Sequence, residues 1–278
     1  MSESQPKAPP QSSLATPEPW NLVSAGYVTE LWEQFSRFSK DALELANVAP
    51  KSDVLDVCTG PGTLALQAAE SARRVVGVDF SPSMLEELRR RAKEGGLTNV
   101  EAVEADGQAL PFGDASFDAA FSMFGLIFFP DRGKGFRELF RVLRPGGRAV
   151  VASWRPFDTV PPIKAVFEVL LEFMPELPFG KSKAPLGEPD EFRAELEAAG
   201  FSAVDVRTVS HKDTASSVGA FWTSMARSTA PLVLLRRRIG EERWTALSES
   251  ILAKLTERFG TGSLDIEPFA LLGMGTKA

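Results

Sequence analysis

The chain has 278 residues, of which 44% are hydrophobic and 24% charged, and its formal net charge is −6. This composition is typical of a soluble globular protein with a sizeable core, and the negative charge argues against nucleic acid as the main partner, because phosphate binding usually leaves a basic footprint. A single cysteine, Cys58, and a single histidine, His211, exclude an internal disulfide framework, a cysteine-based zinc cluster and a multi-histidine metal site, so we expect no metal.

Residues 1–18 are rich in proline and serine, and they lack both the apolar core of a signal peptide and an arginine-rich amphipathic pattern. This composition predicts a flexible tail, followed by one domain over residues 19–278. No apolar run in the sequence reaches the length needed to span a membrane. We therefore expect a cytoplasmic protein without a membrane span.

Short β-branched runs alternate with helical stretches between residues 54 and 154. The segments "DVLDV", "RVVGVDF", "VEAVEAD", "FDAAFSMF" and "RAVVASW" predict strands, and "TLALQAAES", "SPSMLEELRRRAKEGG" and "RGKGFRELFRVL" predict the helices between them. Ser81 and Pro82 suit the N-cap and first position of the second helix. The alternation predicts an α/β fold with a doubly wound, mostly parallel seven-stranded sheet.

The rhythm changes after residue 154. We expect a helix at 160–174, a helix in "EPDEFRAELEAAGF", a strand in "SAVDVRTVSH", wholly helical structure over 213–260 and an antiparallel closing strand in "IEPFALLGMGTK". The segments at about 155–187 and 213–260 are interpreted as helical insertions that cover the substrate. Both ends of the second insertion fall on the ligand side of the predicted sheet, so this insertion could form a lid.

The stretch "VLDVCTGPGT" combines a strand, an acid and two glycines that let the main chain approach a ligand. In an open parallel sheet, ligands bind beyond the carboxyl ends of the strands. Asp56, Asp79 and Asp106 follow three successive predicted strands at that edge. Three acids on one rim suit a ligand that carries an amino group or cation, a ribose and an adenine.

Four motifs in the right order resemble those of class I S-adenosylmethionine (SAM) methyltransferases, most of all the group that includes the ubiquinone/menaquinone C-methyltransferases. The segments are "VLDVCTGPGT", "VVGVDFSPSML", "EADGQALPFGDASFDAAFSMFGLIFFPD" and "ELFRVLRPGGRAVVASW", which together cover over a third of the chain. Cys58 departs from the pattern, since a glycine often stands there. We expect Cys58 to be a small buried residue behind the loop, not a nucleophile.

This resemblance implies that SAM is the cofactor, with its methionine part over Gly60 and Gly62, its ammonium near Asp56, its ribose on Asp79 and its adenine at Asp106. A helix before the first strand would fold over the cofactor. The cofactor-binding residues that follow are Tyr27, Asp56, Thr59, Gly60, Pro61, Gly62, Asp79, Phe80, Met84, Asp106, Gly107, Gln108, Ser122 and Met123.

A dinucleotide fold is the rival interpretation, because Gly60-x-Gly62-x-x-Ala65 also fits the pattern G-x-G-x-x-A. Asp56 stands where a pyrophosphate would be repelled, which favours SAM over an NAD(P)-dependent oxidoreductase. A third possibility is a SAM-binding module without turnover, or an enzyme that uses SAM only as an electrostatic aid.

The substrate side is predicted to be apolar and lined by Trp20, Phe124, Phe128, Trp154, Phe221, Trp222 and Met225. Such a pocket suits a small aromatic, quinone-like, polyketide or terpenoid acceptor. Family analogy favours O-methylation over C- or N-methylation. His211 at the end of the sixth strand is the candidate base, with Asp131 and Asp158 as alternatives. We expect a monomer or a homodimer.

Overall fold

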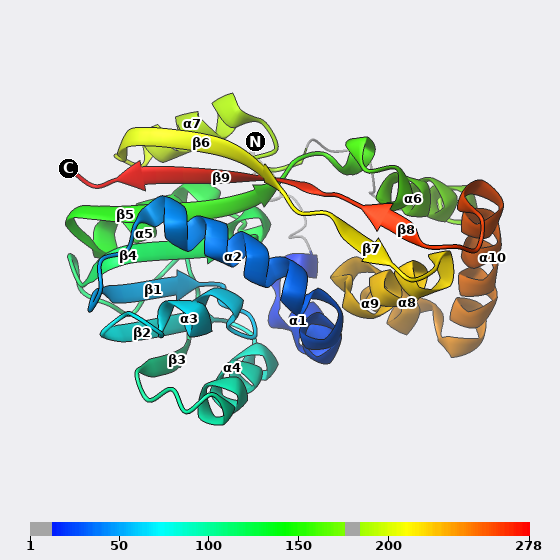
Figure 1. The fold of residues 1–278 in the computed structure, drawn as a ribbon, viewed down its shortest axis with the longest axis horizontal. Helices are drawn as coiled ribbons and strands as arrows, with labels where there is room; N and C mark the ends of the chain where they lie inside the picture. Colours follow the sequence, from blue (N-terminus) through cyan, green and yellow to red (C-terminus); the bar gives the residue numbers. More distant parts are fainter. Residues whose placement is uncertain (1–12, 176–183) are drawn as a thin grey trace, which may run out of the picture.

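The computed structural model describes residues 13–175 and 184–278, and its centre is a seven-stranded sheet in the order β3-β2-β1-β4-β5-β9-β6 (Figure 1). The strands are β1 (Asp53–Val57), β2 (Arg74–Asp79), β3 (Val100–Glu104), β4 (Phe117–Met123), β5 (Leu143–Trp154), β6 (Ser202–Ser210) and β9 (Phe269–Thr276). The first five pair in parallel, and β9 is antiparallel to both β5 and β6. The predicted sheet with an antiparallel last strand is confirmed.

Helices cover both faces of this sheet because its buried strands present apolar side chains alternately to either side. One face packs against α2 (Trp32–Ala46), α3 (Thr63–Ala68) and α4 (Pro82–Glu94) through a core that includes Phe38, Leu64 and Leu88. The other face packs against α5 (Arg132–Val142) and α7 (Pro189–Ala198) through Phe136 and Phe192.

The N-terminal part of the described chain is helical. A short 3-10 turn (Ser13–Ala15) precedes α1 (Pro17–Gly26), which continues through a π-helical segment (Tyr27–Leu31) into α2. The Trp20 indole donates a 2.9 Å hydrogen bond to the Leu14 carbonyl. Residues 13–18 of the predicted tail therefore take part in helical structure, and residues 1–12 lie outside the described residues.

The two insertions fold together on a core of their own. The helices α6 (Pro161–Phe173), α8 (Val218–Ser228), α9 (Ala230–Ile239) and α10 (Glu241–Phe259) share one hydrophobic cluster. Inside it, Trp222 and Trp244 stack with centroids 6.0 Å apart, and the Trp222 indole donates to the Ser248 hydroxyl. We call this unit the helical subdomain. Residues 176–183 of the first predicted insertion lie outside the described residues.

The prediction of wholly helical structure over 213–260 is wrong at its start. Residues Asp213–Ala215 form β7, which pairs antiparallel with β8 (Leu264–Ile266). These two strands lie beyond the end of the main sheet, β7 following β6 and β8 preceding β9 along the chain (Figure 1). Strands of three residues are too short to show a periodic pattern, so sequence periodicity could not reveal them.

Helix α1 lies between the sheet and the helical subdomain, with α4 on one side and α8 and α9 on the other (Figure 1). Within the described chain, every helix is too short or too polar to cross a membrane.

Candidate active site

The loop between β1 and α3 turns sharply at the carboxyl edge of the sheet. Gly60 (φ 54°) and Gly62 (φ 93°) adopt left-handed conformations, which glycine reaches without steric cost. A β-carbon at Gly62 would lie 2.4 Å from Leu88 Cδ1, whereas the space beside Gly60 is open. The loop therefore packs closely on α4 at one glycine and exposes main chain at the other.

Cys58 occupies the left-handed region as well, with φ of 57°, which explains why a glycine suits this position. Its side chain touches Gly125, where an added β-carbon would lie 2.1 Å from Cys58 Cβ. Burial raises the pKa of the Cys58 thiol well above its ordinary value, so this thiol is protonated and is a poor nucleophile. Cys58 lines the cavity described next, so it lies beside the site and not wholly behind the loop.

A cavity of about 210 Å³ opens at the carboxyl ends of the strands, beside this loop. Most of the residues predicted to bind the cofactor line its wall: Tyr27, Asp56, Thr59, Gly60, Pro61, Asp79, Phe80, Met84, Asp106, Gly107, Gln108 and Met123. Three residues predicted on the substrate side, Trp20, Phe124 and Phe128, line the same cavity. The fold thus brings the predicted cofactor and acceptor walls into one space.

Main-chain amides hold the Asp79 carboxylate at the end of β2. Its Oδ2 accepts a 2.9 Å hydrogen bond from the Gly60 amide and its Oδ1 a 2.9 Å bond from the Ser81 amide. Burial nevertheless raises the pKa of Asp79 to about 6, against the lowering effect of these amides. Burial, and then the charge of Asp79, raise the pKa of the neighbouring Tyr27 phenol above its ordinary value.

Asp56 lies deeper in the cavity wall. Burial raises its pKa to about 7, although its Oδ2 accepts a 2.7 Å hydrogen bond from the Thr59 hydroxyl. Its Oδ1 is buried without a hydrogen bond of standard geometry, and the Ala65 amide acts only weakly on the carboxylate. A buried carboxylate with an unused oxygen indicates a place for a donor or a cation.

The residues present fit a SAM molecule better than a dinucleotide. Asp56, Asp79 and Asp106 line the cavity, and among the residues that the structure describes no lysine, arginine or histidine does. An acidic wall attracts the sulfonium and ammonium groups of SAM and repels a pyrophosphate. The open main chain at Gly60 gives such a ligand a surface that it can approach closely.

Aromatic rings form another part of the wall. Trp20 packs edge-on against Phe128 with centroids 4.9 Å apart, and Tyr27 packs against Phe35 at 5.3 Å. The Phe124 backbone is left-handed, with φ of 61°, which is unusual for a bulky residue. Its ring stacks on Trp154 with centroids 4.0 Å apart.

Several predicted site residues lie outside the cavity wall: Gly62, Ser122, Trp154, Phe221, Trp222, Met225 and His211. Ser122 is fully buried in β4, and Trp154 supports Phe124 from behind. Phe221 and Trp222 are buried in the core of the helical subdomain, and Met225 packs against that core. The subdomain thus uses these apolar side chains for its own folding.

His211 also lies away from the cavity wall. Its Nε2 is 2.7 Å from Asp41 Oδ2, and its ring packs against Phe38 with centroids 4.8 Å apart. These contacts join the end of β6 to α2. Of the two alternative bases, Asp131 caps α5 by accepting a 2.8 Å bond from the Lys134 amide, and neither it nor Asp158 lines the cavity.

Sequence reasoning missed part of the wall, including Leu14, Leu31, Trp32 and Phe35. Tyr27, Leu31 and Phe35 are spaced four residues apart, a helical spacing that could have identified them. Leu14 was missed because it falls in the segment predicted to be a flexible tail.

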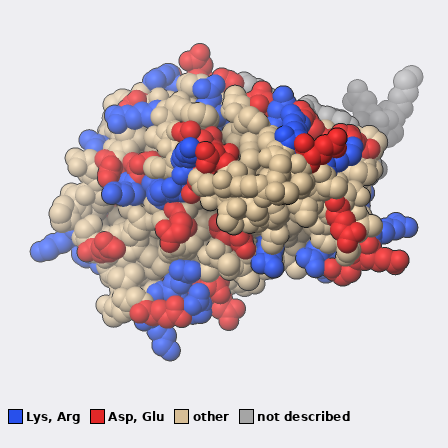
Figure 2. Space-filling model, turned by 45° about the vertical axis from the view of Figure 1, so that its right-hand side comes forward, with Lys and Arg blue, Asp and Glu red and all other residues tan. Residues whose placement is uncertain are grey.

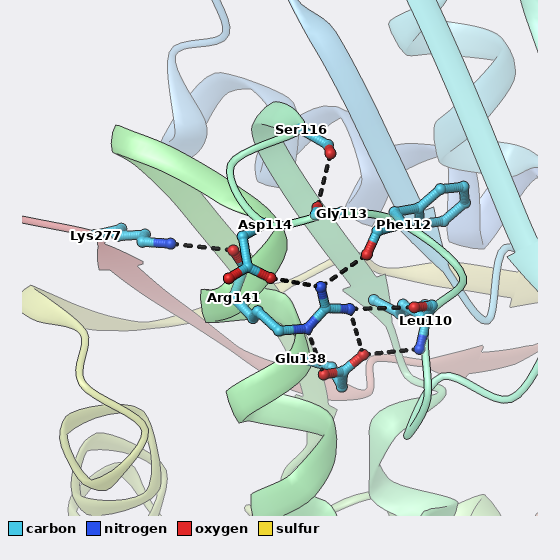
Figure 3. A network of polar contacts seen from close by, with 8 residues as sticks. All are labelled: Leu110, Phe112, Gly113, Asp114, Ser116, Glu138, Arg141 and Lys277. Atoms are coloured by element: carbon cyan, nitrogen blue, oxygen red, sulfur yellow. Dashed lines mark hydrogen bonds and ion pairs between the residues drawn. The ribbon is translucent and has the colours of Figure 1, made fainter.

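A polar network anchors the loop that follows Asp106 (Figure 3). The Arg141 guanidinium donates to the carbonyls of Leu110 and Phe112 over 3.1 and 2.7 Å, and to Glu138. Glu138 in turn accepts a 2.8 Å bond from the Leu110 amide. The hydrogen bond from Arg141 holds the pKa of Glu138 below its usual range. The segment after Asp106–Gln108 is thereby fastened to α5.

Comparison with known proteins agrees with this geometry. Residues 54–147 match the model of a methyltransferase domain family. A demethylmenaquinone methyltransferase of Thermus thermophilus is 39% identical over 182 residues, which is 60% of this chain and 81% of the relative. One of Listeria monocytogenes is 36% identical over 149 residues, and there the match spans 52% of this chain and 62% of the relative.

Solved structures show the same fold at low identity. The YcgJ protein of Bacillus subtilis has a TM-score of 0.60 at 20% identity, over 87% of this chain and 98% of its own. A geranyl diphosphate methyltransferase in complex with SAM has a TM-score of 0.54 at 20% identity, over 92% of this chain and 90% of its own.

The chain belongs to the class I SAM-dependent methyltransferases, in the group that includes the ubiquinone and menaquinone C-methyltransferases. It is therefore an enzyme whose cofactor is SAM, as the sequence motifs predicted.

Proposed function

We propose that this enzyme transfers the methyl group of SAM to a small, largely apolar acceptor. The observation that carries the proposal is the cavity itself, which is lined both by the acids Asp56, Asp79 and Asp106 and by aromatic rings. The acids suit the cofactor, and the rings suit an apolar acceptor.

Each part of the acidic wall has a proposed partner in SAM. Asp79 accepts from the ribose hydroxyls, since the main-chain amides that bind its carboxylate leave part of its acceptor capacity free. Asp106, Gly107 and Gln108 hold the adenine. The glycine loop and Asp56 hold the methionine part, with Tyr27 closing the side next to α1.

SAM supplies a methyl group on a positively charged sulfur, a reactive electrophile. The chain's own contribution is then chiefly to exclude water and to hold the acceptor atom close and in line, an effect of about 7–11 kcal/mol in good cases. The described wall offers no histidine or lysine as a base. An acceptor that loses its proton readily, such as a phenol or a quinol, fits this wall.

We favour oxygen as the accepting atom, with carbon as the alternative. The preference for oxygen rests on the analogy with enzymes that carry helical additions. The alternative rests on the names of the relatives, which are demethylmenaquinone methyltransferases. The match with the Thermus relative covers only 60% of this chain, so a shared acceptor does not follow from it.

The charge distribution supports a small acceptor over nucleic acid. On the face in Figure 2, lysine and arginine side chains are interspersed with aspartate and glutamate and surround an uncharged area. This face lacks the continuous basic stripe that binding of a phosphate backbone requires.

Calorimetry followed by product analysis tests the proposal. We expect the purified protein to bind SAM and not NADH, and to convert a phenol or quinol from a panel into an O-methylated product when given isotopically labelled SAM. Mass spectrometry with fragmentation locates the label. NADH binding without SAM binding would overturn the proposal, and tight SAM binding without any methylated product would favour a non-catalytic module.

A further inference from the structure

Helix α1 lies between the main sheet with its helix α4 and the helical subdomain, and it makes close contacts on both sides. Toward the sheet, Asn21 Oδ1 accepts a 2.7 Å hydrogen bond from the Ser81 hydroxyl, next to the amide that binds Asp79. Toward the helical subdomain, Arg237 pairs with Glu18 at 2.8 Å and Arg227 with Glu30 at 3.7 Å.

A small hydrophobic cluster, separate from the main cores, fills the junction. Val23 from α1, Met84 from α4 and Ala230 from α9 are buried together, and Trp20 and Tyr27 pack against them. Met84, Trp20 and Tyr27 also line the cavity. The helical subdomain therefore reaches the cavity wall through α1, although its own large side chains do not line it.

Gly26 lies in close contact with the backbone of α8. A β-carbon built there would lie 2.2 Å from the Arg227 carbonyl oxygen and 2.9 Å from the Arg227 carbonyl carbon, both in the backbone of α8. Gly26 has ordinary helical backbone angles, with φ of −64°, so the position demands glycine for space and not for conformation. No side-chain rotation could relieve a clash between two backbones.

The residues directly after Gly26 connect this backbone contact to the cavity wall. The π-helical segment Tyr27–Leu31 begins there, and Tyr27 and Leu31 line the wall. Single π-helical turns inside α-helices are frequent at functional sites. Any displacement of α1 from α8 would shift Tyr27 relative to Asp79, whose charge already acts on the Tyr27 phenol.

We propose that Gly26 is a positioning residue for methyl transfer: by allowing the backbones of α1 and α8 to touch, it sets Tyr27 against the cofactor cavity. This inference rests on the proposed function, because it takes the cavity as the SAM site. In this arrangement, the helical subdomain holds α1 in place and thereby positions the part of the cavity wall that Tyr27 forms.

The variant Gly26→Ala tests the inference against Gly219→Ala, a matched glycine-to-alanine change in α8 whose new β-carbon would meet only Ser217 Oγ, at 3.7 Å. Displacements of about 1 Å can cost on the order of 100-fold in rate, so we expect Gly26→Ala to lower kcat/KM by about that factor. We also expect its Kd for S-adenosylhomocysteine, measured by calorimetry well below the melting temperature, to rise about tenfold. Gly219→Ala should change both quantities by less than about twofold.

A folded Gly26→Ala protein with unchanged Kd and kcat/KM would overturn the inference while leaving the proposed function intact. Wild-type protein that binds neither SAM nor S-adenosylhomocysteine would overturn both. Should circular dichroism show that Gly26→Ala is unfolded, Val23→Ala in the junction cluster replaces it, with Val218→Ala in the subdomain core as its control. Weaker binding of S-adenosylhomocysteine in Val23→Ala but not in Val218→Ala supports the inference. Equal binding in the two variants contradicts it.

Discussion

The Gly60 amide donates a 2.9 Å hydrogen bond to Asp79 Oδ2, and this bond ties the loop after β1 to the end of β2. The Ser81 amide binds the other oxygen of the same carboxylate. Asp79 is thereby held in place before any ligand arrives, and its carboxylate retains acceptor capacity toward the cavity. Such preorganisation lowers the entropic cost of binding.

Asp79→Ala should weaken SAM binding more than about tenfold, because hydrogen bonds to a charged partner contribute roughly 1.5–3 kcal/mol each. Isothermal titration calorimetry measures the change. Asp265→Ala, which removes an exposed carboxylate in β8, controls for net charge and should leave the affinity unchanged. Near wild-type affinity in Asp79→Ala would contradict the ribose role.

SAM affinity should increase as the pH rises from about 5.5 to 8. Burial raises the pKa of Asp56 to about 7 and that of Asp79 to about 6, so both carboxyls lose protons over this interval. A cation binds the ionised forms more tightly, and its binding releases protons. Calorimetry in buffers of different ionisation enthalpy measures this release. An affinity that is independent of pH would exclude these carboxylates from the binding site.

Asp56→Asn should stabilise the ligand-free protein at pH 8 more than at pH 5.5. The folded pKa of Asp56 lies above its unfolded value, so its contribution to stability is present at low pH and is lost as the pH rises through about 7. Each kcal/mol gained in the free energy of unfolding should raise the melting temperature by roughly 2–4 °C. The same variant should bind SAM more weakly. A gain in stability that is equal at both pH values would show that folding does not raise the pKa of Asp56.

Gly125→Ala should destabilise the protein by about 1–3 kcal/mol, because the new methyl group would overlap Cys58 Cβ. Cys58→Gly removes that obstacle and also the left-handed strain at residue 58. In urea unfolding, the double variant should be more stable than the sum of the single changes by at least about 0.5 kcal/mol. Strict additivity would show that the two residues do not share this space.

His211→Ala should reduce turnover only a few-fold, since His211 binds Asp41 and packs on Phe38, away from the cavity wall. A general base contributes about 10²–10⁴-fold to rate, so a loss of at least 100-fold would restore the catalytic assignment. Steady-state kinetics against the best acceptor of the panel, with a melting curve as the folding control, separates the two outcomes.

The sheet and the cofactor wall could be predicted because they depend on local signals. Strand-end acids such as Asp56 and Asp79 and the glycines of the loop all fall at chain positions fixed by the βα alternation, and most of them line one cavity. The fold class and the SAM cofactor are confirmed. The positive φ of Cys58 could also be anticipated from the sequence, because a glycine often stands at this position in the family.

The aromatic part of the cavity wall was harder to predict because it depends on how distant helices pack. Phe221, Trp222 and Met225 lie on neighbouring turns of one helix and were predicted to line the substrate side, yet the helical subdomain buries Phe221 and Trp222 in its own core. Trp32 and Phe35 of α2 line the wall instead, next to the π-helical segment that joins α1 to α2. Sequence periodicity identifies a buried face but not the partner that covers it.

The position of β9 sets the order in which the protein can fold during synthesis. The five parallel strands are complete once residue 154 has been made, but β6 can join them only through residues 269–276, which pair with β5 on one side and β6 on the other. At about 5–20 residues per second, a nascent chain waits for several seconds with an open strand edge on β5. Exposed edges invite pairing with other chains, so this interval is when a ribosome-associated chaperone would protect the protein most.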